Sequence, residues 1–226
     1  MKAMIFAAGR GERMGELTRN TPKPLLPVGE QRLIEYHLYR LAALGVSECI
    51  INTYYLAEQF LQVLGDGSRY GLRITYSHET EKLDTGGGII NALDFFDDKP
   101  FLLVNGDVFT DYPFEKLINK KLNSLAHLVL VDNPDHHPQG DFVLQEDSFL
   151  ALSKGQKKLT YAGIALLSPK LVSSYPKGLL SFGNVLMSAI AKGQVTGEYF
   201  GGRWLNVDTP KRLLVAKACV KSYLLY

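Results

Sequence analysis

The 226-residue chain has little cysteine and no long apolar stretch. Its two cysteines, Cys49 and Cys219, lie far apart, one in an apolar run and the other in a helical pattern. Such spacing provides neither a metal motif nor a disulfide framework, so both are expected to pack as small core residues. No segment approaches the ~18 apolar residues that a membrane span requires. The apolar start is also too short for a secretion signal, and we expect a cytoplasmic protein without a membrane partner.

The chain also lacks an excess of charge of either sign. Its 25 Lys and Arg residues nearly balance 23 Asp and Glu residues, for a formal net charge of +2. This balance argues against a broad nucleic-acid-binding or membrane-binding surface. A composition that is 46% hydrophobic and 21% charged is typical of a folded globular protein. We expect one domain covering residues 1–226.

Short apolar runs alternate with helical patterns through the first half of the chain. The expected strands are Lys2–Ala7, Glu48–Asn52, Leu72–Tyr76 and Phe101–Val104, and the expected helices are Leu33–Leu44, Ala57–Leu64 and Gly88–Phe95. This strand–helix order predicts an α/β fold, with a Rossmann-like, mostly parallel sheet and helices on both faces.

The second half is less regular. The expected strands are Ala126–Val131, Asp141–Gln145 and Leu159–Leu167, and the expected helices are Phe182–Ala191 and Pro210–Tyr223. The segment between those two helices reads as a strand, a turn and a strand. We therefore expect a small antiparallel lobe added to the same domain.

The segment 7–14, AAGRGERM, follows the first strand directly. Ligands of open α/β sheets bind beyond the carboxyl ends of the strands. Glycines there let backbone N–H groups approach phosphate oxygens, and Arg13 adds a planar cationic group suited to phosphate. The plainer alternative is a tight strand-to-loop turn. A third alternative is a dinucleotide-binding turn using Gly9, Gly11 and Gly15, which requires an immediate helix and a second strand.

The proline-rich segment 21–28, TPKPLLPV, excludes the dinucleotide-binding alternative. Its three prolines are incompatible with a helix interior or a central strand. Pro22 and Pro24 stiffen the backbone on both sides of Lys23, and a stiff mount lowers the entropy lost when a lysine binds polyphosphate. The plainer alternative for Lys23 is an exposed lysine in a rigid loop.

Residues 7–28 resemble the signature of the sugar-1-phosphate nucleotidylyltransferase family. The Gly-x-Gly-x-Arg-Met motif, the Leu17-Thr18 pair and the Pro-Lys-Pro segment stand in the family's order, and the resemblance continues through most of the chain. It implies a glycosyltransferase-A-like nucleotidyltransferase fold with a nucleotide-binding half at about 1–110 and a sugar-binding half at about 111–226. It also implies transfer of a nucleoside monophosphate from an NTP to a sugar 1-phosphate, with Mg²⁺, and release of pyrophosphate.

The resemblance also implies residue roles. Arg13, Lys23 and Asp107 would be catalytic, with Arg13 and Lys23 on the phosphates. The implied nucleotide-binding residues are Ala7, Ala8, Gly9, Gly11, Glu12, Arg13, Met14, Lys23, Glu81, Thr85, Gly86, Gly87 and Asn105.

A second glycine cluster, Asp84-Thr85-Gly86-Gly87-Gly88, is expected as a loop just before a helix. Backbone donors at a helix N-terminus suit an anion or a flat base, although a simple glycine-rich turn is equally compatible. By resemblance this loop lines the nucleobase pocket, with Glu81 placed to read the base edge.

Two aspartates follow apolar strands. Asp107 ends the Val104-Asn105-Gly106-Asp107 segment, and Asp208 follows Asn206-Val207. Mg²⁺ prefers one or two carboxylates together with phosphate oxygens and water. The alternatives are a turn cap for Asp107 and an N-cap of the last helix for Asp208, before Pro210. The family resemblance makes Asp107 and Asp208 the metal ligands.

The sugar side is less distinctive. The adjacent residues His136 and His137 suggest a metal, but loop neighbours rarely converge on one ion and no third ligand is near. The resemblance assigns Gly140, Asp141, Gly163 and Asn206 to the sugar. The usual Glu-Lys-Pro that carries the phosphate-binding lysine is missing here, and the sequence has Lys154, Lys157 and Lys158 instead.

The short His/Pro-containing loop resembles a subgroup that includes N-acetylmuramate-1-phosphate uridylyltransferases of peptidoglycan recycling. By sequence this subgroup is hard to tell from mannose-1-phosphate guanylyltransferases, and glucose-1-phosphate uridylyl- or thymidylyltransferases remain alternatives. A different class is also open, a non-catalytic nucleotide-sugar-binding regulatory subunit. No nucleic-acid partner is expected, and the chain is expected to be a monomer or a homodimer.

Overall fold

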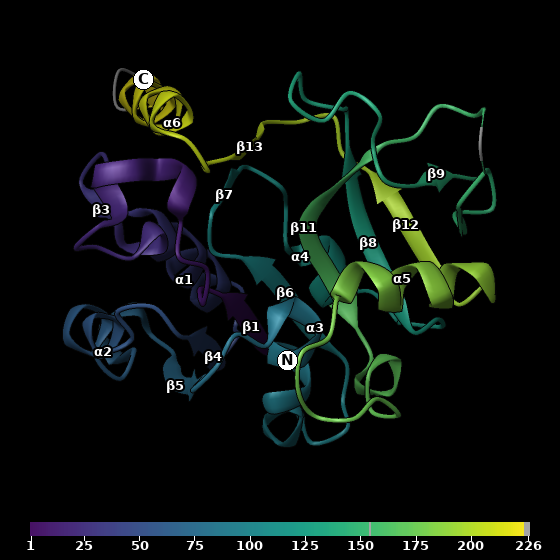
Figure 1. The fold of residues 1–226 in the computed structure, drawn as a ribbon, viewed down its shortest axis with the longest axis horizontal. Coiled ribbons are helices and arrows are strands. Elements are labelled where there is room, and N and C mark those ends of the chain that lie inside the picture. Colours follow the sequence, from purple (N-terminus) through teal and green to yellow (C-terminus); the bar gives the residue numbers. More distant parts are fainter. Residues whose placement is uncertain (154, 224–226) are drawn as a thin grey trace.

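The computed structural model describes residues 1–153 and 155–223, apart from the side chains of 221–223. Its centre is a seven-stranded sheet in the order β12-β8-β11-β6-β1-β4-β5 (Figure 1). The strands are β1 (Lys2–Phe6), β4 (Glu48–Thr53), β5 (Arg73–His78), β6 (Phe101–Asn105), β8 (Ala126–Val131), β11 (Thr160–Leu167) and β12 (Val195–Tyr199). Strands β6, β1, β4 and β5 are parallel, which confirms the expected mostly parallel core.

The second half extends this sheet and adds antiparallel pairing within the same domain, as the sequence predicts. β11 pairs antiparallel with both β6 and β8, and β12 is parallel to β8. Further antiparallel pairing occurs in three two-stranded sheets and in two isolated bridges, Phe142 with Leu159 and Phe149 with Thr196. The three sheets are β2 (Pro27–Val28) with β3 (Gln31–Arg32), β7 (Val108–Thr110) with β13 (Trp204–Asn206), and β9 (Val143–Leu144) with β10 (Leu150–Ala151).

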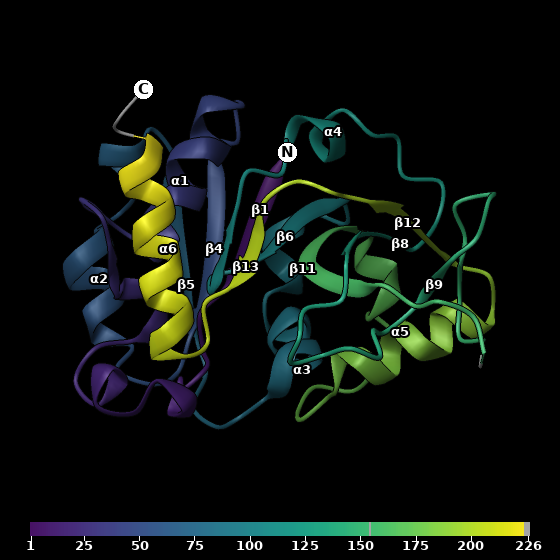
Figure 2. The same cartoon turned by 90° about the horizontal axis from the view of Figure 1, so that it is seen from above.

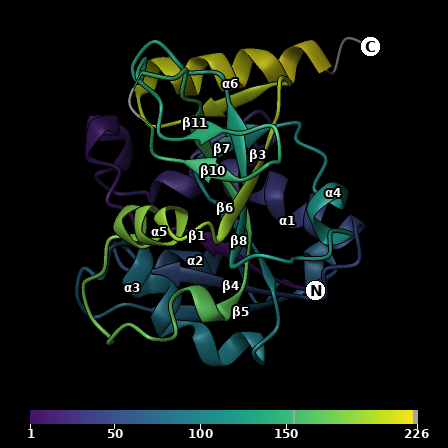
Figure 3. The ribbon, with the colours of Figure 1, turned by 90° about the vertical axis from the view of Figure 1, so that its right-hand side faces the viewer.

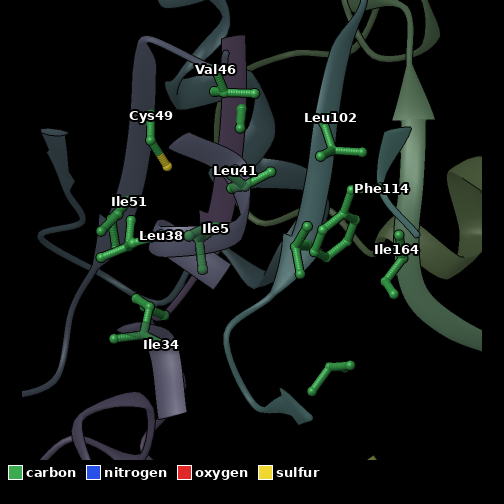
Figure 4. Close-up of a cluster of buried hydrophobic side chains, with 14 of the residues drawn as sticks. Ile5, Ile34, Leu38, Leu41, Val46, Cys49, Ile51, Leu102, Phe114 and Ile164 are labelled. Carbon is green, nitrogen blue, oxygen red and sulfur yellow. The ribbon is translucent and has the colours of Figure 1, made fainter. Parts of the chain in front are cut away.

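Helices cover both faces of the sheet, as the strand pattern predicts. Side chains of α1 (Leu33–Ala43), α2 (Glu58–Leu64) and α4 (Glu115–Ile118) join one core cluster, and those of α3 (Asp84–Asn91) and α5 (Phe182–Ala191) join the other. In β1, Ala3 and Ile5 belong to the first cluster and Met4 to the second, because successive side chains of a strand point to opposite faces. Figure 4 shows part of the first cluster, with side chains of α1 beside those of β1 and β4.

The last helix, α6 (Pro210–Tyr223), forms a third cluster outside the sheet. Its residues Leu213 and Ala216 pack with Met14, Val28 and Leu33 from the first part of the chain. Figure 2 shows α6 beside α1, and in Figure 3 it lies across one end of the molecule. The end of the chain therefore packs against its beginning. Within the described residues, no helix has the length and apolar character needed to span a membrane.

The glycine cluster 84–88 is helical, which corrects the expected loop. α3 begins at Asp84, whose φ of 58° marks the turn into it, and ends at Asn91. Glycine is a poor helix former, so propensity alone argues against this start. Close packing explains why glycine stands in this helix start, because a Cβ on Gly87 would lie 2.1 Å from the Gly178 carbonyl oxygen. Five short 3₁₀ helices complete the described structure, at Glu12–Thr18, Lys23–Leu25, Ser68–Tyr70, Leu93–Phe96 and Pro169–Leu171.

Candidate active site

The glycine-rich loop after β1 is folded back onto the Pro-Lys-Pro segment. Gly11 has a φ of 68°, and a Cβ there would lie 3.0 Å from Thr18 and 3.1 Å from Lys23. The Thr18 hydroxyl donates to the Gly11 carbonyl over 2.9 Å, and the Met14 N–H donates to the same oxygen over 2.8 Å. Glycine at position 11 is therefore required both by backbone conformation and by space.

Two adjoining cavities open at the carboxyl ends of the parallel strands. The larger is about 520 Å³, and the smaller is about 250 Å³. Ala8, Gly9, Lys23 and Lys82 line both. The larger is also lined by Arg10, Gly11, Glu12, Arg13, Tyr54 and Asp208, and the smaller by Phe6, Ala7, Pro24, Asn52, Asp84, Thr85, Asn105 and Asp107. Most of the residues expected at the nucleotide thus surround one continuous region.

Lys23 and Asp107 form an ion pair between the two loops. The Lys23 ammonium lies 2.6 Å from a carboxylate oxygen of Asp107, and the side chains are only 13% and 21% exposed. Asp107 follows β6, and the N–H of the preceding Gly106 donates to the Phe6 carbonyl over 2.9 Å. The ends of β1 and β6 are therefore joined directly behind the ion pair.

Asp208 is held by two arginines. Its side chain is 1% exposed, and one carboxylate oxygen lies 2.6 Å from Arg13 Nη1 without hydrogen-bond geometry. The other oxygen pairs with Arg212 of α6. The N–H of Val207 donates to the Asp107 carbonyl over 2.8 Å, which brings the backbones of the two aspartates together.

The donor set around the two aspartates suits Mg²⁺. Two carboxylates on adjoining backbones beside a phosphate-sized cavity match its preference for hard oxygen ligands completed by phosphate and water. The Asp208 Oδ2 atom is buried and contacts Arg13 as an ion pair without a hydrogen bond, and only one oxygen of Asp107 is bonded to Lys23. Within the described residues, no group of three or more His, Cys, Asp or Glu side chains forms an all-protein metal site.

The residues that we expected near the nucleobase, Glu81, Gly86 and Gly87, do not line the two main cavities. The N–H groups of Gly86 and Gly87 donate to the Leu180 carbonyl over 3.0 and 3.3 Å, so both are engaged within the protein. Glu81 is exposed and lines a different cavity of about 230 Å³, together with Gly87. Met14 is 1% exposed and belongs to the α6 cluster. Among the expected nucleotide contacts, these four do not line the two main cavities.

A buried network behind the loop was not found from the sequence. Asn52 at the end of β4 accepts from the Ala7 N–H over 2.9 Å and donates to Glu79 over 2.7 Å. Both side chains are nearly inaccessible, and burial raises the pKa of Glu79 above its ordinary value. Gly88 packs on this pair, because a Cβ there would lie 2.9 Å from Glu79 and 3.0 Å from Asn52. The network fixes the first residue of the glycine-rich loop.

Besides the two main cavities, a further cavity of about 290 Å³ continues from Arg13 and Asp208 toward β11, and we call it the third cavity of the site. It is lined by Arg13, Asn105, Val108, His136, His137, Thr160, Tyr161, Ala162, Gly163, Trp204, Asn206 and Asp208. Gly163 has a φ of 71°, and a Cβ there would lie 2.5 Å from Asn105 Nδ2. The Asn206 Oδ1 atom is buried without a hydrogen bond.

Two of the four expected sugar contacts, Gly163 and Asn206, line this third cavity, whereas Gly140 and Asp141 lie behind it. Gly140 packs on Asn133, and a Cβ there would lie 2.5 Å from the Asn133 Oδ1 atom. The described lining includes no lysine, and Lys154 lies outside the described residues. A lysine substitute for the missing Glu-Lys-Pro is therefore not seen among the lining residues that the structure describes.

Comparison with known proteins defines the class to which this site belongs. A family model described as nucleotidyl transferase matches residues 2–143, which is more than half of the 226-residue chain. The chain belongs to the nucleotidyl transferase family.

Particular relatives sharpen this assignment. The chain is 44% identical over 231 aligned positions to N-acetylmuramate alpha-1-phosphate uridylyltransferase of Neisseria meningitidis serogroup B, covering 99% of this chain and 100% of the relative. It is 30% identical to a mannose-1-phosphate guanyltransferase of Yarrowia lipolytica over 95% of this chain, but it spans only 62% of that relative.

Solved structures agree on the fold. A Bacillus anthracis protein assigned as a glucose-1-phosphate thymidylyltransferase superposes with a TM-score of 0.84 and 23% identity, covering 98% of this chain and 95% of that one. HddC from Yersinia pseudotuberculosis gives a TM-score of 0.81 and 22% identity, covering 97% and 99%. These likenesses concern the architecture.

Proposed function

We propose that this chain transfers UMP from UTP to N-acetylmuramate 1-phosphate, with Mg²⁺, in the recycling of peptidoglycan. The observation that carries the proposal is the 44% identity to the Neisseria uridylyltransferase along the full length of both chains. The site geometry supports it, because phosphate-binding groups and two carboxylates surround adjoining cavities. Since UTP and sugar phosphates are cytoplasmic metabolites, the proposal places the enzyme in the cytoplasm.

The reaction requires positioning and charge neutralisation. An oxygen of the sugar 1-phosphate attacks the α-phosphorus of UTP, the bond from that phosphorus to the β-phosphate oxygen breaks, and pyrophosphate leaves. The nucleophile is already anionic, so no general base is needed. Lys23 and Arg13 supply fixed positive charge at the phosphates. Asp107 and Asp208 would hold Mg²⁺, which supplies further neutralisation of the triphosphate when bound.

A second candidate is guanylyl transfer to mannose 1-phosphate. It is favoured by the identity of 30% to the Yarrowia guanyltransferase over 95% of this chain. A regulatory subunit without activity receives no such support. Arg13, Lys23, Asp107 and Asp208 all lie at the cavities, and the relatives compared here carry enzyme names.

The deciding experiment is pyrophosphate release by the purified chain over a matrix of nucleotides and acceptors. UTP, GTP, dTTP, CTP and ATP are each combined with N-acetylmuramate, mannose, glucose and N-acetylglucosamine 1-phosphates. Activity confined to UTP with the muramate acceptor is the expected result, and it should disappear on chelation and return with Mg²⁺. Activity with GTP and mannose 1-phosphate would move the protein to the second candidate. If folded protein released no pyrophosphate in any combination, both candidate functions would be overturned.

A further inference from the structure

The third cavity contains a histidine pair with no assigned role. His136 and His137 lie on the turn between β8 and β9 and line the cavity that also contains Arg13 and Asp208. Because these two shared residues also face the larger cavity, a group bound at the histidines lies next to the phosphate-binding region. The proposed function places the nucleotide phosphates at Arg13 and the acceptor in this neighbouring cavity, so the inference rests on the proposed function.

The turn that carries the histidines is firmly built. Asn133 donates to the carbonyls of Pro138 and Lys158 over 3.1 and 2.9 Å, and it accepts from the Thr160 hydroxyl over 2.9 Å. The His137 N–H donates to the Pro134 carbonyl over 2.8 Å. A side chain mounted on such a turn loses little entropy when it binds, which is the property expected of a recognition element.

Asp141 orients His137. One carboxylate oxygen lies 2.9 Å from His137 Nε2, and the other accepts from the Tyr161 N–H over 2.8 Å. A carboxylate accepts only, so His137 Nε2 donates to Asp141, and Nδ1 is an acceptor whenever the ring is neutral. His136 is exposed and makes no hydrogen bond within the described part of the chain. In either protonation state its imidazole has at least one N–H donor.

We propose that His136 and His137 contact the acceptor directly and take the place of the missing lysine. His136 donates an N–H to an acidic oxygen of the acceptor, and His137 accepts from a hydroxyl or amide N–H of the sugar. Asp141 is a positioning residue that acts through His137. The acidic oxygen belongs either to the 1-phosphate or to the carboxylate of a lactyl ether on the sugar, and a suitable pair of acceptors separates these sources.

The test compares kinetics of His136→Gln and His137→Gln with wild type, varying UTP and acceptor separately. We expect kcat/KM for the acceptor to fall about tenfold to a hundredfold, with the KM for UTP unchanged. Asp141→Asn should give a smaller loss of the same kind. His78→Gln is the matched control, since His78 is exposed at the end of β5 and does not line the third cavity.

The acceptors are N-acetylmuramate 1-phosphate and N-acetylglucosamine 1-phosphate, which differ by the lactyl ether. A loss confined to the muramate acceptor in His136→Gln identifies the carboxylate, and an equal loss with both identifies the phosphate. Unchanged acceptor kinetics in both histidine variants, or a parallel rise in the KM for UTP, would overturn the inference. If wild type transfers to no acceptor, the proposed function fails. Calorimetric binding of the two sugar phosphates to wild type and variants then decides the histidine roles alone.

Discussion

The two halves of the proposed active site are built in different ways. On the nucleotide side, residues 7–11 form one continuous loop that leads into the 3₁₀ helix carrying Arg13, and Lys23 follows closely behind it. On the acceptor side, the cavity is assembled from separate segments around Asn105, His136, Tyr161 and Asn206. A continuous loop depends mainly on its own backbone geometry, whereas an assembled cavity depends on how β11, β13 and the turn after β8 pack together. Substitutions in the two halves should therefore fail in different ways.

The largest expected effect is on chemistry at the nucleotide side. Lys23→Ala removes the fixed charge 2.6 Å from Asp107 and should lower kcat by a factor on the order of 10²–10⁴. Lys99→Ala, at an exposed lysine, is the control and should retain wild-type activity. Steady-state kinetics and a thermal melt measure both. If Lys23→Ala had the wild-type melting temperature and full activity, Lys23 would not be a catalytic residue.

An intermediate effect is expected where the two halves meet. Gly163→Ala forces a side chain into a φ of 71° and against Asn105, and it should lower the free energy of unfolding by about 1–3 kcal/mol. Gly193 has a similar φ of 64° with no atom within 4 Å of an added Cβ. Denaturant unfolding of Gly193→Ala therefore measures the backbone strain alone. Equal losses in both variants would show that the Asn105 contact contributes nothing.

The smallest effect concerns two carboxyls with opposite pKa shifts, the buried Glu79 and the partly exposed Glu198. Burial raises the pKa of Glu79 above 4.5, so its contribution to stability falls as pH rises from 4.5 through the raised value. Hydrogen bonds from His127 and Tyr112 lower the pKa of Glu198, so its contribution is lost as pH falls below 4.5. At pH 7 the free energy of unfolding of Glu79→Gln should be within about 1 kcal/mol of the wild-type value or higher, and that of Glu198→Gln should be lower.

Urea unfolding of both variants across pH 3–8 measures this difference, with wild type as the reference. The wild type should gain stability relative to Glu79→Gln as the solution is acidified, and lose it relative to Glu198→Gln. If the difference in unfolding free energy between wild type and variant changed in the same direction with pH for both variants, the opposite pKa shifts would be contradicted.

Sequence reasoning brought residues to one site where their position follows from their neighbours in the chain, and the roles of those residues stay predictions. The glycine loop, Lys23 and the strand-ending Asp107 fall into this group, and they meet at one site. Reasoning from local propensity was wrong at 84–88, because the close approach of Gly178 and Leu180 makes a glycine-rich helix start favourable there. That approach depends on residues some ninety positions away, which no local pattern reveals.

Residues whose roles depend on distant partners were missed altogether. Asn52 reads as an ordinary strand end, yet it ties Ala7 to Glu79 across the sheet. Arg212 reads as an exposed helix residue, yet it pairs with the buried Asp208 four positions earlier. The i, i+4 spacing of Asp208 and Arg212 was a signal that could have revealed this pair.

The packing of α6 on the first part of the chain has a consequence for synthesis. A growing polypeptide emerges from the ribosome with its amino end first. Strand β1 and the phosphate-binding loop are made early, but Asp208 and Arg212 come from a segment made some two hundred residues later. Nascent chains stopped before β13 can pair the parallel strands of the sheet and still lack one of the two carboxylates at the centre. Under the proposed function, a nascent chain becomes competent for transfer only after β13 and Asp208 have been made.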